Sequence, residues 1–139
     1  MILEMALVIA ITDGDTVKVM DNQNQHYKIR LASIDAPERK QPFGKKSTEL
    51  LASKIGNQRV TLNCPNKDRY GRWICGISYQ GQDVNRWMVE QGGAWVYRQY
   101  YKGKDYYIAE NTAKDQQLGL WKTSEYQVMP PWEWRKAHK

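Results

Sequence analysis

The feature of this chain that most limits its fold is a series of short segments, in its first half, in which apolar and polar residues alternate. In the clearest of them, Tyr27, Ile29 and Leu31 share one face while Lys28 and Arg30 share the other. Side chains of a β-strand point alternately to its two faces, so a period of two indicates half-buried strands. We therefore expect strands of a small antiparallel sheet at residues 16–20, 26–31, 59–64 and 73–79.

The apolar run Met5–Ile11 precedes these segments. It is far shorter than the roughly 20 residues of a membrane span, and it lacks the basic start of a signal peptide. We expect a buried strand there and no membrane association, although a signal could have been removed upstream. Asp13-Gly14 then predicts a tight turn into the next strand.

Helical spacing and end signals predict three helices. The first covers residues 45–55, the second begins after the N-cap candidate Asp83 and ends at Gly92-Gly93, and the third covers residues 104–118. Strands that come first, with one helix inserted and two later, indicate an α+β fold in which helices pack on a closed five-stranded barrel.

The length of 139 residues suits a single core. We expect one domain over residues 1–121 and a tail over residues 122–139, where two adjacent prolines prevent a long helix. The tail tryptophans, Trp132 and Trp134, are expected to pack on the domain, with stacking on a nucleobase as the alternative.

Lys and Arg outnumber Asp and Glu by 21 to 15, which gives a net charge of +6. This surplus favours a polyanionic partner, most commonly nucleic acid, over a surface that is charged only for solubility. The two cysteines, Cys64 and Cys75, match no zinc pattern. They lie on the apolar faces of two strands joined near Arg69-Tyr70, so two buried thiols and a cross-strand disulfide both remain open. His26 and His138 belong to no motif.

Carboxylates and arginines gather in three short motifs: Asp-Gly-Asp-Thr at residues 13–16, Arg-Leu-Ala-Ser-Ile-Asp-Ala-Pro-Glu at 30–38, and Asp-Arg-Tyr-Gly-Arg at 68–72. Phosphodiester hydrolysis needs oxygen ligands for a divalent cation, a base for water, and donors for the charge that grows on the phosphate. Arginine suits the last task because its planar fork binds two phosphate oxygens. Each motif alone could be a turn or a solvated loop, but together they indicate phosphodiester chemistry.

These motifs, in this order, resemble those of the staphylococcal (micrococcal) nuclease family. The resemblance runs from about residue 9 to residue 121 and includes Val84-Asn85 and Leu118-Gly119-Leu120-Trp121. It implies an OB-fold barrel with three helices. It also implies a calcium-dependent endonuclease that hydrolyses DNA and RNA and leaves 3′-phosphate ends. The net charge of +6 and the absence of a base-reading motif indicate little sequence specificity, and a small barrel cleft favours single strands.

The resemblance also implies roles for single residues. Calcium is expected on the carboxylates of Asp15 and Asp35, on the backbone carbonyl of Ala36 and on waters. Glu38 is the implied general base. The implied phosphate and transition-state ligands are Arg30 and Arg72, and the implied nucleotide contacts are Tyr70 and Tyr100.

The chain departs from the type enzyme in three places: Ala36 replaces a threonine, the segment between Glu38 and Gly44 is short, and the tail beyond Trp121 has no counterpart. A monomer in a secreted or periplasmic location is the expectation that the family suggests. The competing hypothesis is a binding module without catalysis on the same barrel. Such a module should have lost part of the carboxylate and arginine set, whereas this chain retains it.

Overall fold

The computed structural model describes residues 1–122 and 128–139. The longer strands are β1 (Ile2–Asp13), β2 (Thr16–Met20), β3 (His26–Leu31), β5 (Arg59–Lys67) and β6 (Trp73–Tyr79). The two-residue strands are β4 (Ile34–Asp35), β7 (Gln82–Asp83) and β8 (Trp95–Val96). The helices are α1 (Gly44–Ile55), α2 (Val84–Glu90), α3 (Asp105–Asp115), the 3₁₀ turn η1 (Gly119–Trp121) and α4 (Pro131–Ala137).

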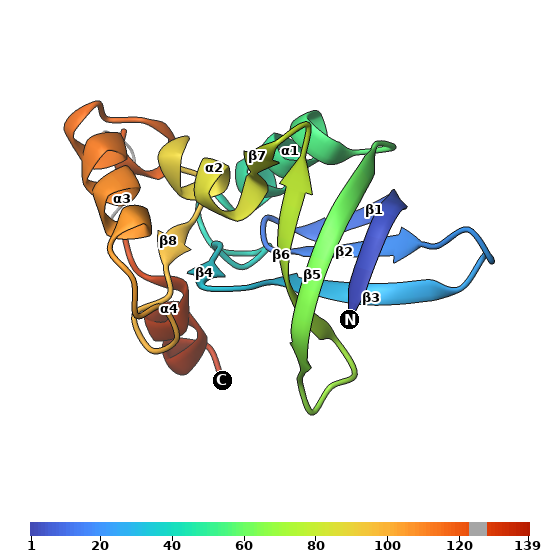
Figure 1. Ribbon diagram of the computed structural model, residues 1–139. Helices are drawn as coiled ribbons and strands as arrows, with labels where there is room; N and C mark the ends of the chain where they lie inside the picture. Colours follow the sequence, from blue (N-terminus) through green and yellow to red (C-terminus); the bar gives the residue numbers. More distant parts are fainter. Residues whose placement is uncertain (123–127) are drawn as a thin grey trace.

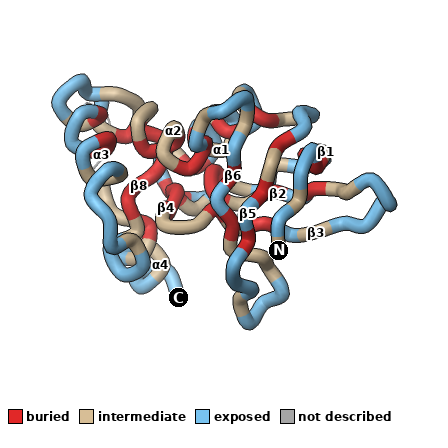
Figure 2. Tube along the Cα trace, in the orientation of Figure 1, coloured by how far each residue is buried: buried red, intermediate tan, exposed pale blue. Residues whose placement is uncertain are grey.

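Five strands close into a barrel (Figure 1). The sheet runs in the order β3-β2-β1-β5-β6, and a parallel pairing of β3 with β6 joins its two edges. The inward residues of these strands, including Val17, Ile29, Leu31 and Leu62, are fully buried and form the core that Figure 2 shows in red. The predicted α+β fold with a closed five-stranded barrel is therefore confirmed.

The first strand is longer than predicted and is only partly buried. Of the run Met5–Ile11, Ala6 and Val8 are fully buried and Ile11 packs against the core from a partly exposed position, whereas Met5 is 56% exposed. The register of β1 against β5 shifts between Leu3 and Ala6, and Met5 has a positive φ of 57°. This irregularity turns Met5 outward, as bulges do. The run Met5–Ile11 is therefore part of a strand, as predicted, but the prediction that this strand is buried was wrong.

The predicted helices are present as α1, α2 and α3, and the Asp83 carboxylate caps α2 by accepting a hydrogen bond from the Arg86 N–H at 3.0 Å. Gly92 ends this region with a φ of 73°, and a Cβ there would lie 2.2 Å from the Leu118 carbonyl oxygen. The fourth helix, α4, was not predicted. It starts with Pro131 in its first turn, where the missing N–H has no partner to lose.

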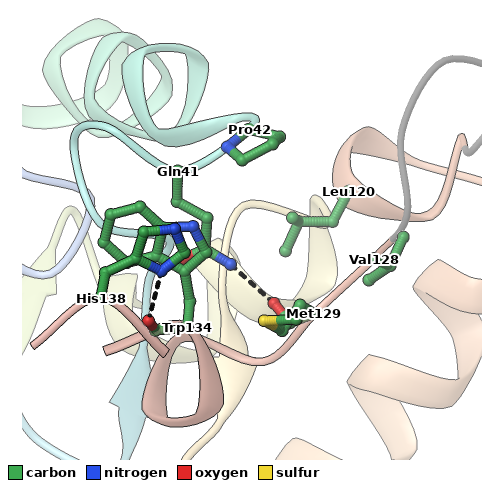
Figure 3. A pocket seen from close by; sticks show the side chains of 7 residues that line it. All are labelled: Gln41, Pro42, Leu120, Val128, Met129, Trp134 and His138. Atoms are coloured by element: carbon green, nitrogen blue, oxygen red, sulfur yellow. Dashed lines mark hydrogen bonds between the residues drawn. The ribbon is translucent and has the colours of Figure 1, made fainter. Parts of the chain in front are cut away.

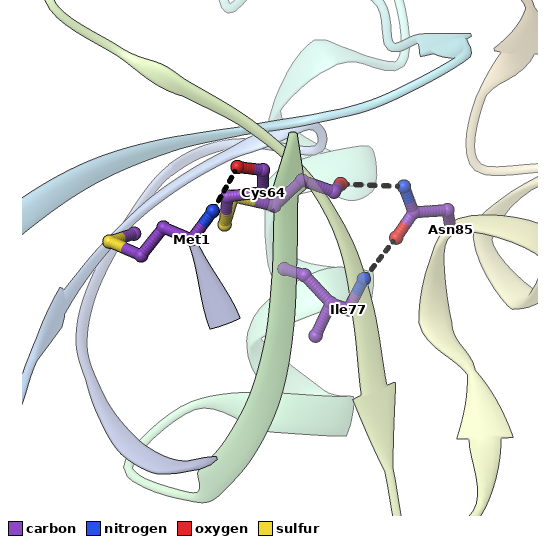
Figure 4. Close-up of a disulfide and its surroundings, with 5 residues drawn as sticks. Met1, Cys64, Ile77 and Asn85 are labelled. Atoms are coloured by element: carbon purple, nitrogen blue, oxygen red, sulfur yellow. Dashed lines mark hydrogen bonds between the residues drawn. A yellow bond between two sulfur atoms is a disulfide. The ribbon is translucent and has the colours of Figure 1, made fainter. Parts of the chain in front are cut away.

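Cys64 of β5 and Cys75 of β6 form a disulfide in the barrel wall, with Cα atoms 4.1 Å apart and both residues fully buried (Figure 4). Of the two alternatives left open by the sequence, the structure shows the bridge. Beside it, the buried Asn85 side chain donates to the carbonyls of Ala32 and Cys75 at 3.0 Å and accepts from the Ile77 N–H at 3.0 Å. In the described part of the chain, no helix is long and apolar enough to cross a membrane.

Candidate active site

The turn between β1 and β2 places Asp15 against β4. Gly14 makes this approach possible, because a Cβ at that position would lie 1.9 Å from Ser47 Oγ and 2.9 Å from Ala36 Cβ. Asp15 Oδ2 accepts a hydrogen bond from the Ala36 N–H at 2.7 Å, and Asp15 Oδ1 accepts one from the Thr16 hydroxyl at 2.9 Å. The Asp15 carboxylate is therefore buried and fixed in orientation.

Arg30 joins this carboxylate to that of Asp35. Its Nη2 lies 3.4 Å from Asp15 Oδ2 and 3.4 Å from Asp35 Oδ1. Its Nη1 donates to the carbonyls of Leu31 at 2.6 Å and Ile34 at 2.9 Å, which holds the guanidinium over the end of β3. Two buried carboxylates, one from the turn between β1 and β2 and one from β4, thus lie beside the same arginine.

The electrostatics around Asp15 and Asp35 favour the binding of a cation. Burial raises the pKa of Asp35 to about 6, and the Asp15 charge adds to this effect although Arg135 and Arg30 oppose it. Burial, followed by the charges of Asp15 and Glu38, also raises the pKa of Asp13. Negative charge is therefore crowded here, and a bound cation would relieve the repulsion.

The donor set suits a hard divalent ion that keeps part of its water shell. Asp15 and Asp35 supply carboxylate oxygens, and Ala36 adjoins both. Within residues 1–122 and 128–139, no group of three acidic, histidine or cysteine side chains forms a ready-made cage. A cation would therefore complete its coordination with backbone oxygens and water, which calcium accepts readily because its shell of six to eight oxygens is flexible.

Glu38 lies at the mouth of the site and is paired with a residue that the sequence motifs did not predict. Its Oε1 accepts a hydrogen bond from Nη1 of Arg135, in α4, at 2.7 Å. The same guanidinium donates to both oxygens of Asp35, at 3.1 and 2.8 Å, and to the Tyr97 hydroxyl at 3.3 Å. Hydrogen bonds from Arg135 to Asp35, and next to Glu38, raise the pKa of Arg135, so its guanidinium is permanently charged.

Arg72, the residue before β6, forms an ion pair with Asp68. In the parallel register of β3 and β6, Arg30 pairs with Ile74, and Arg72 lies two residues before Ile74. Asp68 Oδ2 accepts a hydrogen bond from Arg72 Nε at 2.8 Å. Burial alone would raise the pKa of Asp68, but hydrogen bonds from Arg72 and Tyr70 lower it.

The predicted nucleotide-contacting tyrosines lie farther out. Tyr70 is 66% exposed and its ring lies 5.8 Å from the Arg72 guanidinium carbon. Tyr100 is 61% exposed and its ring meets that of Tyr97 edge to face at 4.8 Å. Tyr97, which was not predicted, lies nearer the carboxylates: its hydroxyl accepts a hydrogen bond from Arg135 at 3.3 Å and its ring centroid lies 5.9 Å from the Arg30 guanidinium carbon. Burial and then the Asp35 charge raise the pKa of Tyr97. The only sequence signal for it was the aromatic segment around it.

Comparison with known proteins gives a consistent result. Residues 28–123 match the family described as staphylococcal nuclease homologue. The chain is 43% identical over 130 residues to an uncharacterized endonuclease of Escherichia coli, which covers 92% of this chain and 82% of that protein. It is 40% identical over 144 residues to a micrococcal nuclease of Shigella flexneri, which covers 95% and 80%. A protein of Haemophilus influenzae, also described as an uncharacterized endonuclease, is 39% identical over 132 residues, with 95% and 73% covered. With this barrel, these carboxylates and this likeness over most of its length, the chain belongs to the staphylococcal nuclease family.

Proposed function

We propose that this nuclease of the staphylococcal nuclease family is a calcium-dependent endonuclease that hydrolyses DNA and RNA and leaves 3′-phosphate ends. The observation that carries the proposal is the pair of buried carboxylates, Asp15 and Asp35, which both lie 3.4 Å from Nη2 of Arg30. Two buried carboxylates repel each other and would also repel the phosphates of a nucleic acid. A cation bound between the carboxylates and a phosphate would remove both repulsions.

Asp15, Asp35 and the backbone carbonyl of Ala36 would hold the calcium ion. When bound, it supplies positive charge against a phosphate oxygen. Asp15 is suited to this role because the Ala36 N–H and the Thr16 hydroxyl already fix its carboxylate. Fixed ligands hold a metal without reorganising, which keeps the site ready for substrate.

Glu38 would take the proton from the attacking water, since its carboxylate lies at the mouth of the site and only part of it is buried. Arg30 and Arg72 would bind the scissile phosphate and meet the charge that develops on it. Asp68 supports this role by holding Arg72 through Nε, which leaves both Nη groups for phosphate oxygens. Tyr70 and Tyr100, both exposed, would contact the neighbouring nucleotide.

Contacts to phosphate imply weak sequence preference, and the basic surface supports this, with a net charge of +6. We expect single strands to be cut fastest, because a small barrel face accepts unpaired strands more easily than a duplex. The protein would act as a monomer. A secreted or periplasmic location is consistent with the Cys64–Cys75 disulfide, since such bonds persist in oxidising compartments.

The test is a cleavage assay on single- and double-stranded DNA and on RNA, with calcium, with magnesium and with a chelator. We expect calcium to support cleavage, magnesium to support little, and the chelator to abolish it, because magnesium demands a stricter octahedron. Glu38→Gln should lower kcat by roughly 10²–10⁴-fold while the protein stays folded. Full activity in chelator would reject the metal assignment. Near-wild-type turnover by a folded Glu38→Gln protein would favour the binding-module hypothesis.

A further inference from the structure

The C-terminal helix inserts one cation into the site described above. Arg135 of α4 donates to both carboxylate oxygens of Asp35, which is 1% exposed, and to Oε1 of Glu38. The proposed metal ligand and the proposed base therefore share one guanidinium. Paired in this way, the Glu38 oxygen that Arg135 holds is not free to accept a hydrogen bond from water in the same position.

The tail that carries Arg135 is anchored on both sides of the site. Trp132 stacks on Tyr97 with ring planes 6° apart and centroids at 5.7 Å, and it meets Trp95 of β8 edge to face. Gln41 donates to the Met129 carbonyl at 2.7 Å and accepts from the Glu38 N–H at 3.0 Å. The Gln41 side chain thus connects the tail to the backbone of Glu38, and Arg135 of the same tail binds the Glu38 carboxylate.

A pocket borders this anchored segment. A cavity of about 280 Å³ lies between α4 and the loop that precedes α1, and Gln41, Pro42, Leu120, Met129 and Trp134 are among the residues that line it (Figure 3). Arg135 is held mainly by charge and hydrogen bonds at its tip. Its side chain is 37% exposed, so the guanidinium can leave the carboxylates without unfolding the barrel.

A divalent cation on Asp35 would compete with this guanidinium. Calcium binds carboxylate oxygens at about 2.3–2.6 Å, while Arg135 already occupies both oxygens of Asp35. Two cations on one carboxylate would lie within roughly 5 Å of each other and repel strongly in a buried setting. The fork of Arg135 and the metal therefore cannot both bind Asp35 well.

We propose that Arg135 is a resident cation of the site, which the divalent metal must displace from Asp35 and Glu38. The tail then sets the metal concentration at which the site becomes competent, and it masks the base until metal arrives. This inference rests on the proposed function, because it requires a metal on Asp35. The remaining arginine, Arg30, stays in place, since the backbone carbonyls of Leu31 and Ile34 hold its Nη1.

The test compares the calcium affinity of the full chain with that of Arg135→Gln, Arg135→Lys and Lys136→Gln, by calorimetry at about pH 8, where carboxyl groups are ionised. Lys136 is the matched control because it is the next residue on α4, its side chain is exposed, and its replacement removes the same charge. We expect Arg135→Gln to bind calcium at least tenfold more tightly, Arg135→Lys to lie between it and the wild type, and Lys136→Gln to change affinity less than about twofold. Thermal unfolding checks that each variant folds.

The outcomes separate this proposal from the proposed function. Equal calcium affinity in all four proteins would overturn the competition and leave the metal site standing. Unchanged affinity with lost cleavage in Arg135→Gln would make Arg135 a phosphate ligand and overturn the competition as well. If none of the four proteins binds calcium, the metal assignment fails, and this proposal fails with it.

A second measurement follows Arg135 in the wild-type protein and needs a variant only to assign the signal. In the metal-free wild-type protein, nuclear magnetic resonance should show slowly exchanging, hydrogen-bonded guanidinium protons for Arg135, besides those of other hydrogen-bonded arginines such as Arg30 and Arg98. Arg135→Lys assigns that signal by its loss. Calcium at saturation should speed its exchange to that of exposed arginines. A guanidinium that stays protected at calcium saturation would overturn the proposal.

Discussion

Asp35→Asn should stabilise the metal-free protein at neutral and mildly alkaline pH. The burial of Asp35 raises its pKa from 3.8 to about 6, even with Arg135 and Arg30 beside it. A raised pKa means that the ionised carboxylate is less favourable in the folded protein than in the unfolded chain. Asparagine keeps the shape and polarity of the side chain and removes the charge that burial opposes.

The magnitude follows from the pKa. The difference between 3.8 and about 6 is about two units, and each unit corresponds to about 1.4 kcal/mol, so the ionised carboxylate costs about 3 kcal/mol of stability. The sign follows from proton linkage. The protonated form adds stability that is fully present below about pH 4 and is lost as the pH rises through about 6. Asp35→Asn should therefore raise the free energy of unfolding by up to about 3 kcal/mol near pH 8 and by little near pH 4.

The assay is urea unfolding of both proteins in a chelator at about pH 8 and at about pH 4, with the difference between them compared at each pH. Asp115→Asn is the control, because it makes the same chemical change at an exposed position at the end of α3 and should shift stability by less than about 0.5 kcal/mol. A destabilised Asp35→Asn protein at pH 8 would refute the reasoning. It would mean that the arginines more than offset the burial of the charge, and that the pKa of Asp35 lies below its ordinary value.

Three further outcomes are expected. Arg72→Lys should lower kcat by roughly 10²–10³-fold in the cleavage assay, because lysine keeps the charge but not the two-pronged contact with phosphate; unchanged turnover would remove Arg72 from the mechanism. Asn85→Ala should lower the free energy of unfolding by about 3 kcal/mol or more in urea titrations, because it leaves the buried Ile77 N–H and the carbonyls of Ala32 and Cys75 without the hydrogen bonds of the Asn85 side chain. A loss below about 1 kcal/mol would contradict that reasoning. Unreduced, denatured protein should show no free thiol in a thiol titration. Replacing Cys64 and Cys75 together with alanine should lower stability by at least about 2–3 kcal/mol, from a short loop of sequence separation 11, and two titratable thiols would disprove the bridge.

The parts of the fold that were predictable from sequence are those in which local pattern and tertiary environment agree. The alternation in residues 26–31 predicted β3 because a strand in a barrel wall has one face toward the core and the other toward solvent. Asp83 predicted the start of α2 because a cap acts within one turn of helix. The burial of β1 was misjudged because a bulge reverses the facing of Met5, and an apolar run carries no trace of that shift.

The three motifs predicted the carboxylates of the site for a different reason. Asp15 and Asp35 are 20 residues apart in sequence; Asp15 follows the predicted Asp13-Gly14 turn, whereas Asp35 lies in β4, a strand that was not predicted. Their meeting depends on Gly14, whose lack of a side chain lets the two segments touch. α4 and Arg135 offered no comparable signal. The helix has only seven residues, too few to be stable alone, so its existence depends on the aromatic surface of Tyr97 and Trp95.

Charge balance explains why a residue so distant in sequence belongs to this site. Arg135 is 100 residues from Asp35 and 97 from Glu38, and no local pattern connects them. A buried carboxylate cluster without metal needs a cation from somewhere, because uncompensated charge is excluded from a protein interior. Arg30 supplies part of that charge from within the barrel, and it cannot leave without breaking its backbone contacts. The second cation comes from a segment that the barrel does not need for closure, so it can be given up when a metal takes its place. An arginine outside the three motifs is thus the residue best suited to be exchanged, and the arginine inside them is the one best suited to stay.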